Sequence, residues 1–148
     1  MDAVTYSNHE VAKFVEAHFI PVQFNVAEQP DAMDRFHAPW TPTLIVQSPD
    51  GAEMRRSQGY LDPDRFLAEM SLAWFKEAID RRDYETAHQR VPETLQRTKG
   101  DPEREPEALY WAAVTQYKAR DNGLLEGWNR LMEQFPNSEW ARKVEFIK

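Results

Sequence analysis

The stretch Trp40-Thr41-Pro42-Thr43-Leu44-Ile45-Val46 combines a proline turn with a short run of apolar residues. A continuous apolar run of this length is typical of a strand that is covered on both faces. The residues that follow, Ser48-Pro49-Asp50-Gly51, have the composition of a β-turn, in which proline sets φ and glycine accepts a positive φ. Residues 52–58 are mostly polar and include Arg55 and Arg56, so we expect a charged edge strand there. The tract therefore predicts a strand–turn–strand unit that begins directly after the proline.

Two helices and a further strand are predicted on the N-terminal side of this tract. Ser7 and Glu10 form a capping-box pattern that starts the first helix. Between residues 20 and 26 apolar and polar residues alternate, which is typical of a strand. Pro21 lies at its first position, where a missing N–H matters least. Pro30 is well placed as the first residue of a second, short helix.

The C-terminal half of the chain is predicted to be entirely helical. Asp62 and Pro63 cap and start a long helix. Apolar residues then recur at helical spacing in three further ranges, 84–95, 109–117 and 124–135, and a last helix is predicted over 139–147. This change in composition divides the chain into a mixed domain over residues 1–75 and a helical region over residues 76–148.

The order of elements between residues 19 and 75 resembles the C-terminal two-thirds of thioredoxin. Asn25-Val26 occupies the place of that family's strand-end Asn-Ile-Asp, and Thr41-Pro42-Thr43 the place of its cis-proline turn. Gly59 occupies the place of a glycine that borders the substrate groove. The resemblance implies that a peptide groove is lined by Trp40, Thr41, Pro42, Gly59 and Tyr60. In the alternative interpretation Pro42 is only a packing corner, and the two aromatic residues belong to the core or to a hinge.

The chain contains no cysteine, whereas the redox members of the thioredoxin family carry a Cys-X-X-Cys motif before the matched region. Without a thiolate, the chain has neither a disulfide nor a dithiol redox centre. The segment 1–4 resembles the continuation of the helix that follows those cysteines. We therefore expect an α/β fold (α+β by content), thioredoxin-like but truncated at the N-terminus, with about three strands. The strands at 20–26 and 43–47 would each have an unpaired edge.

The second half resembles a different family. Glu107–Ala113 together with Phe135–Ala141 resembles a tetratricopeptide repeat, and Tyr84–Ala87 resembles the start of the second helix of an earlier repeat. Two degenerate repeats are fewer than the three or so that an independent solenoid needs. We therefore expect these helices to pack against each other or against the first half.

No catalytic site, metal site or cofactor is predicted. Ser48 and Ser57 lack a nearby histidine and acid, and the five glycines are too scattered for a phosphate loop. The net charge of −7, with interspersed basic residues, argues against a nucleic-acid partner. No apolar run reaches the ~18 residues of a membrane span, so no membrane partner is expected. The histidines do not have metal-ligand spacing; they are His9, His18, His37 and His88.

Three functions remain open after this reasoning. The first is a redox-inactive interaction module that binds a peptide or a protein. The second is the C-terminal part of a thiol-disulfide oxidoreductase whose Cys-X-X-Cys lies upstream of Met1. The third is a self-assembling structural domain, for example a homodimer formed through the unpaired strand edges. As written, the chain begins without a signal peptide, so we expect a cytoplasmic location unless an upstream leader was omitted.

Overall fold

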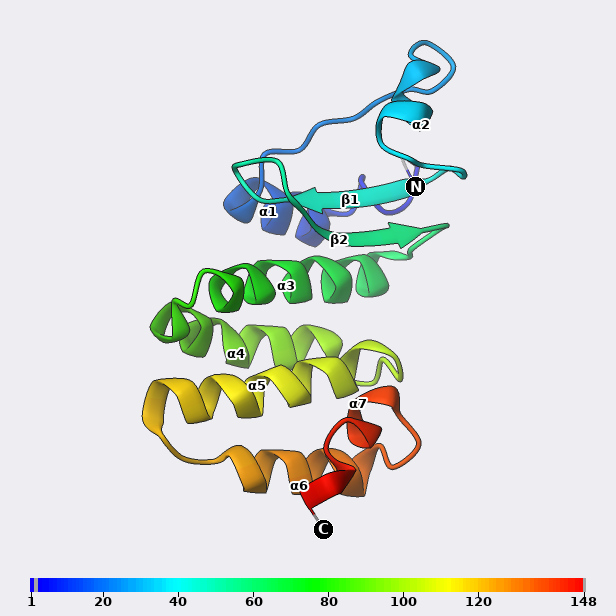
Figure 1. Cartoon of the computed structure of the whole chain (residues 1–148). Helices are drawn as coiled ribbons and strands as arrows, with labels where there is room; N and C mark the ends of the chain where they lie inside the picture. Colours follow the sequence, from blue (N-terminus) through cyan, green and yellow to red (C-terminus); the bar gives the residue numbers. More distant parts are fainter. Residues whose placement is uncertain (2, 148) are drawn as a thin grey trace. The chain divides into compact units, whose positions relative to one another are not determined.

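The computed structural model describes residues 1 and 3–147, coloured along the sequence in Figure 1. The chain forms two compact units, Met1–Phe66 and Leu67–Lys148, and each is described here by itself. The boundary between them falls near the start of helix α3 (Pro63–Asp80). The described residues form seven α-helices and one two-stranded sheet, so the fold is mixed α+β, as predicted. Among these residues, no helix combines the length and the apolar character that crossing a bilayer requires.

The first unit is built around an antiparallel hairpin of β1 (Thr43–Gln47) and β2 (Glu53–Gln58), which lie side by side in Figure 1. The turn between them closes with a hydrogen bond from the Gly51 N–H to the Ser48 carbonyl, 2.9 Å long, and Gly51 has a φ of 88°. The hairpin therefore has the strand–turn–strand order that the apolar tract predicts. Its register shifts between Val46 and Gln47, which face Arg55 and Glu53, so that Met54 is an extra residue in β2.

The predicted strand at 20–26 is wrong. Within the described residues the sheet has two strands rather than about three, and residues 19–25 follow an irregular path without strand pairing. The alternating pattern encodes a preference for extended backbone, but a strand needs a neighbour with which to pair. The Ile20 and Val22 side chains are 94% and 72% exposed, whereas the Phe24 ring packs against the Phe36 ring at 5.1 Å between centroids.

The N-terminal residues also differ from their prediction. Helix α1 (His9–His18) is capped by Asn8, whose side chain accepts from the Glu10 and Val11 N–H groups, and not by Ser7. The Ser7 hydroxyl instead donates to carbonyls of the preceding turn. Residues 3–7 form turns rather than the continuation of a helix, and Asp2 lies outside the described residues. This start is held by the buried Thr5 hydroxyl, which donates to the Leu61 carbonyl at 2.6 Å.

The second unit consists of packed helices. After the end of α3 come α4 (Tyr84–Thr98), α5 (Arg104–Arg120), α6 (Leu124–Gln134), α7 (Glu139–Arg142) and the short 3-10 helix η1 (Glu145–Ile147). Helices α4, α5 and α6 follow one another as antiparallel neighbours (Figure 1). One core cluster joins α3 to α4 through Phe75, Ala78, Ile79 and Ala87. A second joins α5, α6 and the C-terminal residues through Leu109, Leu131, Ala141 and Val144.

A largely buried ion cluster connects α3 to the start of α5. The Arg104 guanidinium donates to the Glu69 carboxylate at 2.6 Å and to the Asp101 carboxylate at 3.0 Å. Asp101 also accepts from the N–H groups of Glu103 and Arg104, both at 3.0 Å, and so caps the first turn of α5. Burial raises the pKa of the Asp101 carboxyl, but these N–H and guanidinium donors lower it by more, so its pKa lies below the ordinary value.

Candidate functional site at the open end of the hairpin

The five residues predicted to line a groove all lie at the open end of the β1–β2 hairpin. Trp40, Thr41 and Pro42 lead directly into β1, while Gly59 and Tyr60 directly follow β2. The strand register pairs the first residue of β1 with the last residue of β2, which brings the two groups together. The Gly59 N–H donates to the Pro42 carbonyl at 2.8 Å. The hairpin thus places residues about 17 positions apart in the sequence next to each other.

The backbone at this end has a defined shape. The Thr41–Pro42 peptide bond is cis, and the Thr43 hydroxyl donates to the Trp40 carbonyl at 2.6 Å. Gly59 has a φ of 93°, in the region that favours glycine. Within the part of the chain that the structure describes, neither the N–H nor the carbonyl of Thr41 makes a hydrogen bond. An exposed donor and an exposed acceptor are therefore available on one residue.

Both aromatic residues of the site are open to solvent. The Trp40 side chain is 67% exposed and the Tyr60 side chain 56% exposed. Large aromatic surfaces that remain exposed are characteristic of binding positions, since burying them on a partner is favourable. By contrast, the tryptophans of the second unit are at least half-buried and pack within it: Trp111, Trp128 and Trp140 each lie 5–6.5 Å from the Tyr110 ring or from one another.

Sequence reasoning missed one residue that supports this end of the hairpin. It interpreted Arg56 as a charge that protects an edge strand. In the structure the Arg56 guanidinium donates to the Phe36 carbonyl at 2.8 Å and to both carboxylate oxygens of Glu53 at 2.6 and 2.7 Å. The hydrogen bond from Arg56 lowers the pKa of the Glu53 carboxyl and that from Glu53 raises the pKa of Arg56. The spacing Glu53-x-x-Arg56 was the available signal in the sequence. It brings the two side chains together, however, only because a bulge in β2 puts them on the same face.

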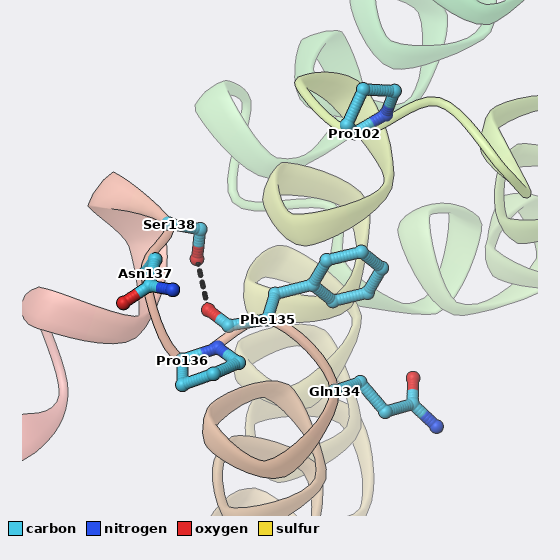
Figure 2. A pocket seen from close by; sticks show the side chains of 6 residues that line it. All are labelled: Pro102, Gln134, Phe135, Pro136, Asn137 and Ser138. Atoms are coloured by element: carbon cyan, nitrogen blue, oxygen red, sulfur yellow. Dashed lines mark hydrogen bonds between the residues drawn. The ribbon is translucent and has the colours of Figure 1, made fainter.

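A hollow in the helical unit is shown in Figure 2. Its volume is about 350 Å³, and the loop before α5, the end of α6 and the loop before α7 line it through Pro102, Gln134, Phe135, Pro136, Asn137 and Ser138. The Ser138 hydroxyl donates to the Phe135 carbonyl at 2.8 Å and accepts from the Ala141 N–H at 3.0 Å. Ser138 thus serves as the N-cap of α7, which explains its presence without a ligand.

Among the described residues, no group of three or more His, Asp or Glu side chains is placed to hold one ion. The lowered pKa values of carboxyls have local structural causes: Glu85 is paired with Arg120 at 2.8 Å, Asp83 caps α4, and Asp50 accepts from the Ser48 hydroxyl in the hairpin turn. The strongest candidate site is therefore the exposed aromatic and main-chain surface at the end of the hairpin.

Comparison with known proteins bears on the first half of the chain. Residues 1–74 match the sequence model of the thioredoxin-like domain, which covers half of the 148 residues. No curated protein and no solved structure matches the chain.

Proposed function

Because the chain belongs to the thioredoxin-like domain family, we propose that it is a redox-inactive module that binds an extended segment of a peptide or protein. The binding site is the open end of the β1–β2 hairpin. The observation that carries the proposal is the main chain of Thr41, which makes no hydrogen bond among the described residues, at an end of the hairpin that also carries the exposed aromatic residues Trp40 and Tyr60. The chain itself supplies no thiolate, so binding without disulfide exchange is the activity that its residues support.

An extended peptide fits this surface for two reasons. Its main chain can donate to and accept from Thr41, as in peptide recognition by strand addition. Its side chains can then cover the Trp40 and Tyr60 rings, and aromatic contacts contribute roughly 0.5–1.5 kcal/mol each beyond the area that they bury. Only a few side chains take part, so we expect affinities in the micromolar range, near −8 kcal/mol.

The test is a binding screen with a library of fluorescent 10-residue peptides, followed by anisotropy titrations of the best binder. The variants Trp40→Ala and Tyr60→Ala should each weaken binding by about tenfold, the equivalent of about 1.4 kcal/mol. The matched control is Tyr117→Ala, because Tyr117 is also an exposed aromatic residue, at 40%, but belongs to α5. Equal affinity of all three variants and the unchanged protein would refute the site.

Self-assembly is a second candidate function, favoured by the segment 19–26. This segment contains no charged residue, and its Ile20 and Val22 side chains are almost fully exposed. Charges are the usual protection of unpaired strands, and their absence favours pairing with another chain. Analytical ultracentrifugation between 5 and 500 μM (about two decades around the affinities of weak complexes) separates this function from the first. A dimer that dissociates in the variant Val22→Lys and binds no peptide would favour self-assembly.

We further propose that residues 76–148 form tetratricopeptide-like helical hairpins, next to a mixed domain over 1–75. The antiparallel succession of α4, α5 and α6 supports helical hairpins in this region. So does the close approach of α5 and α6, where a Cβ added to Gly127 would lie 2.5 Å from the Cβ of Ala113. Helical hairpins of such repeats pack through small residues and bury a shared core between neighbours. A fragment of residues 62–148, which keeps the whole of α3 and its cap Asp62, should remain helical and unfold cooperatively, and an unfolded fragment would contradict the proposal.

A further inference from the structure

Arg56 makes four hydrogen bonds, two to Glu53 in its own strand β2 and two to carbonyls at the end of the preceding helix. Its Nε and Nη2 atoms donate to the two carboxylate oxygens of Glu53, at 2.7 and 2.6 Å. Nη2 also donates to the Phe36 carbonyl at 2.8 Å, and Nη1 donates to the His37 carbonyl at 3.3 Å. The guanidinium is therefore fixed on one side by a carboxylate and holds two main-chain carbonyls on the other.

The bulge in β2 makes this arrangement possible. In a regular strand successive side chains alternate between faces, so residues three apart point to opposite sides. Met54 is an extra residue in the register, because Glu53 faces Gln47 while Arg55 faces Val46. One inserted residue restores an even spacing, and bulges are known to redirect side chains in this way. Glu53 and Arg56 consequently meet on one face and form a paired, two-point contact.

The carbonyls that Arg56 holds belong to the C-terminus of α2 (Asp31–Arg35). The His37 N–H donates to the Asp34 carbonyl at 3.2 Å, and the Ala38 N–H donates to the Met33 carbonyl at 2.8 Å. His37 has a φ of 48°, so this is a Schellman-type ending with histidine in the left-handed position that glycine usually occupies. The last carbonyls of a helix have no partner within it, and Arg56 supplies donors to two that follow the last turn.

We infer that Arg56 is a positioning residue for the hairpin-end site: it fixes the connection from His37 to Trp40 and thereby the placement of Trp40 and Thr41. The inference rests on the proposed function only for its purpose, since Trp40 and Thr41 would be placed there to bind a peptide. His37 is three residues before Trp40, and residues 38–40 contain no regular secondary structure of their own. A loop of this kind takes its conformation from its two ends. One end is the hairpin itself, and the other is the helix ending that Arg56 holds.

The experiment compares Arg56→Gln and Arg56→Lys with Arg65→Gln, a control that removes an exposed arginine paired with Asp62. The Trp40 indole N–H resonance, assigned by its loss in Trp40→Phe, reports on the loop. Hydrogen exchange at the His37 and Ala38 amides reports on the helix ending. Both Arg56 variants should shift the Trp40 indole signal and speed hydrogen exchange at the His37 and Ala38 amides about tenfold. Lysine is expected to behave like glutamine here, because it keeps the charge of arginine but not the planar guanidinium that donates to several acceptors at once. The control should change neither, and the indole signals of the other tryptophans should stay in place.

Unchanged indole position and unchanged exchange at residues 37–38 in Arg56→Gln would overturn the inference. If that variant does not fold, Glu53→Gln is measured in the same way, since it leaves Arg56 in place and removes the carboxylate that orients it. The affinity of the best peptide should fall about tenfold in the Arg56 variants and stay constant in the control. If no peptide binds the unchanged protein, the proposed function fails, while the two spectroscopic measurements still decide whether Arg56 positions Trp40.

Discussion

A close contact between α5 and α6 gives the sharpest prediction, the effect of Gly127→Ala. Gly127 lies inside α6, and a Cβ at this position would be 2.5 Å from the Cβ and 3.3 Å from the Cα of Ala113 in α5. Carbon atoms pack best at about 3.5–4.0 Å, so the two helices would have to separate by roughly 1 Å. Overpacking of this kind costs about 1–3 kcal/mol, whereas Gly to Ala gains about 1 kcal/mol in helix propensity. The difference is a net loss of about 0–2 kcal/mol, and we expect a value of about 1 kcal/mol.

The measurement is urea unfolding followed by circular dichroism at the helical band. The matched control is Asn129→Ala, which lies on the exposed face of the same helix and should gain about 0.5 kcal/mol from propensity alone. A second variant exchanges the two small residues, Ala113→Gly with Gly127→Ala. It returns the number of methyl groups in the contact to its original value, so it should recover most of the stability lost in Gly127→Ala.

Stability of Gly127→Ala at or above that of the unchanged protein would refute this reasoning. Propensity would then decide the outcome at both positions, and the approach of α5 to α6 would be looser than the structure has it. A loss that the exchange variant does not recover would indicate instead that the position of the methyl group matters more than the space it needs.

Three further predictions concern single residues. Because the pKa of the Asp101 carboxyl is lowered, its charge stabilises the fold above about pH 4, and this contribution is lost as the pH falls through the lowered pKa. The variant Asp101→Asn can still cap α5 but carries no charge, so the melting temperature should fall less steeply with acid than in the unchanged protein. His37→Gly should stabilise the protein by up to about 1 kcal/mol in thermal unfolding, because glycine adopts a positive φ without the cost that histidine bears there, whereas His37→Val should destabilise it. The purified chain should not accelerate insulin reduction by dithiothreitol in a turbidity assay, and measurable turnover would contradict the assignment of a site without thiol chemistry.

Local patterns were enough to predict most of the elements. The apolar run at 44–46 and the Ser48–Gly51 turn led to β1 and β2, because turn chemistry and strand preference act over a few residues. The helices from Pro63 onward followed from apolar periodicity and from caps such as Asp62, whose side chain accepts from the Arg65 N–H. These signals are contained in the segments that they shape, so a single sequence is sufficient to read them.

Features that depend on a distant partner could not be predicted in this way. The alternation at 20–26 specifies which side chains would share a face, but not whether another strand lies beside them. The cap of α1 lies one residue after the predicted one, since Asn8 and Ser7 are both good caps and the choice depends on the turn before them. The role of Arg56 depends on the bulge at Met54, and a register shift is a property of the paired strands rather than of either one.

The charges around the hairpin also bear on how an extended peptide would approach it. β2 carries three charged residues, Glu53, Arg55 and Arg56, and charged residues discourage the addition of a further strand, although the Glu53 and Arg56 side chains are here bound to each other. β1 contains no charged residue, and within the described residues it pairs only with β2. Thr41, with its free main chain, comes two residues before β1. We therefore expect a bound peptide to run from Thr41 along β1 and not along β2. A peptide in that position could pair with the main chain of Thr41 and with the main chain of β1 in one continuous stretch.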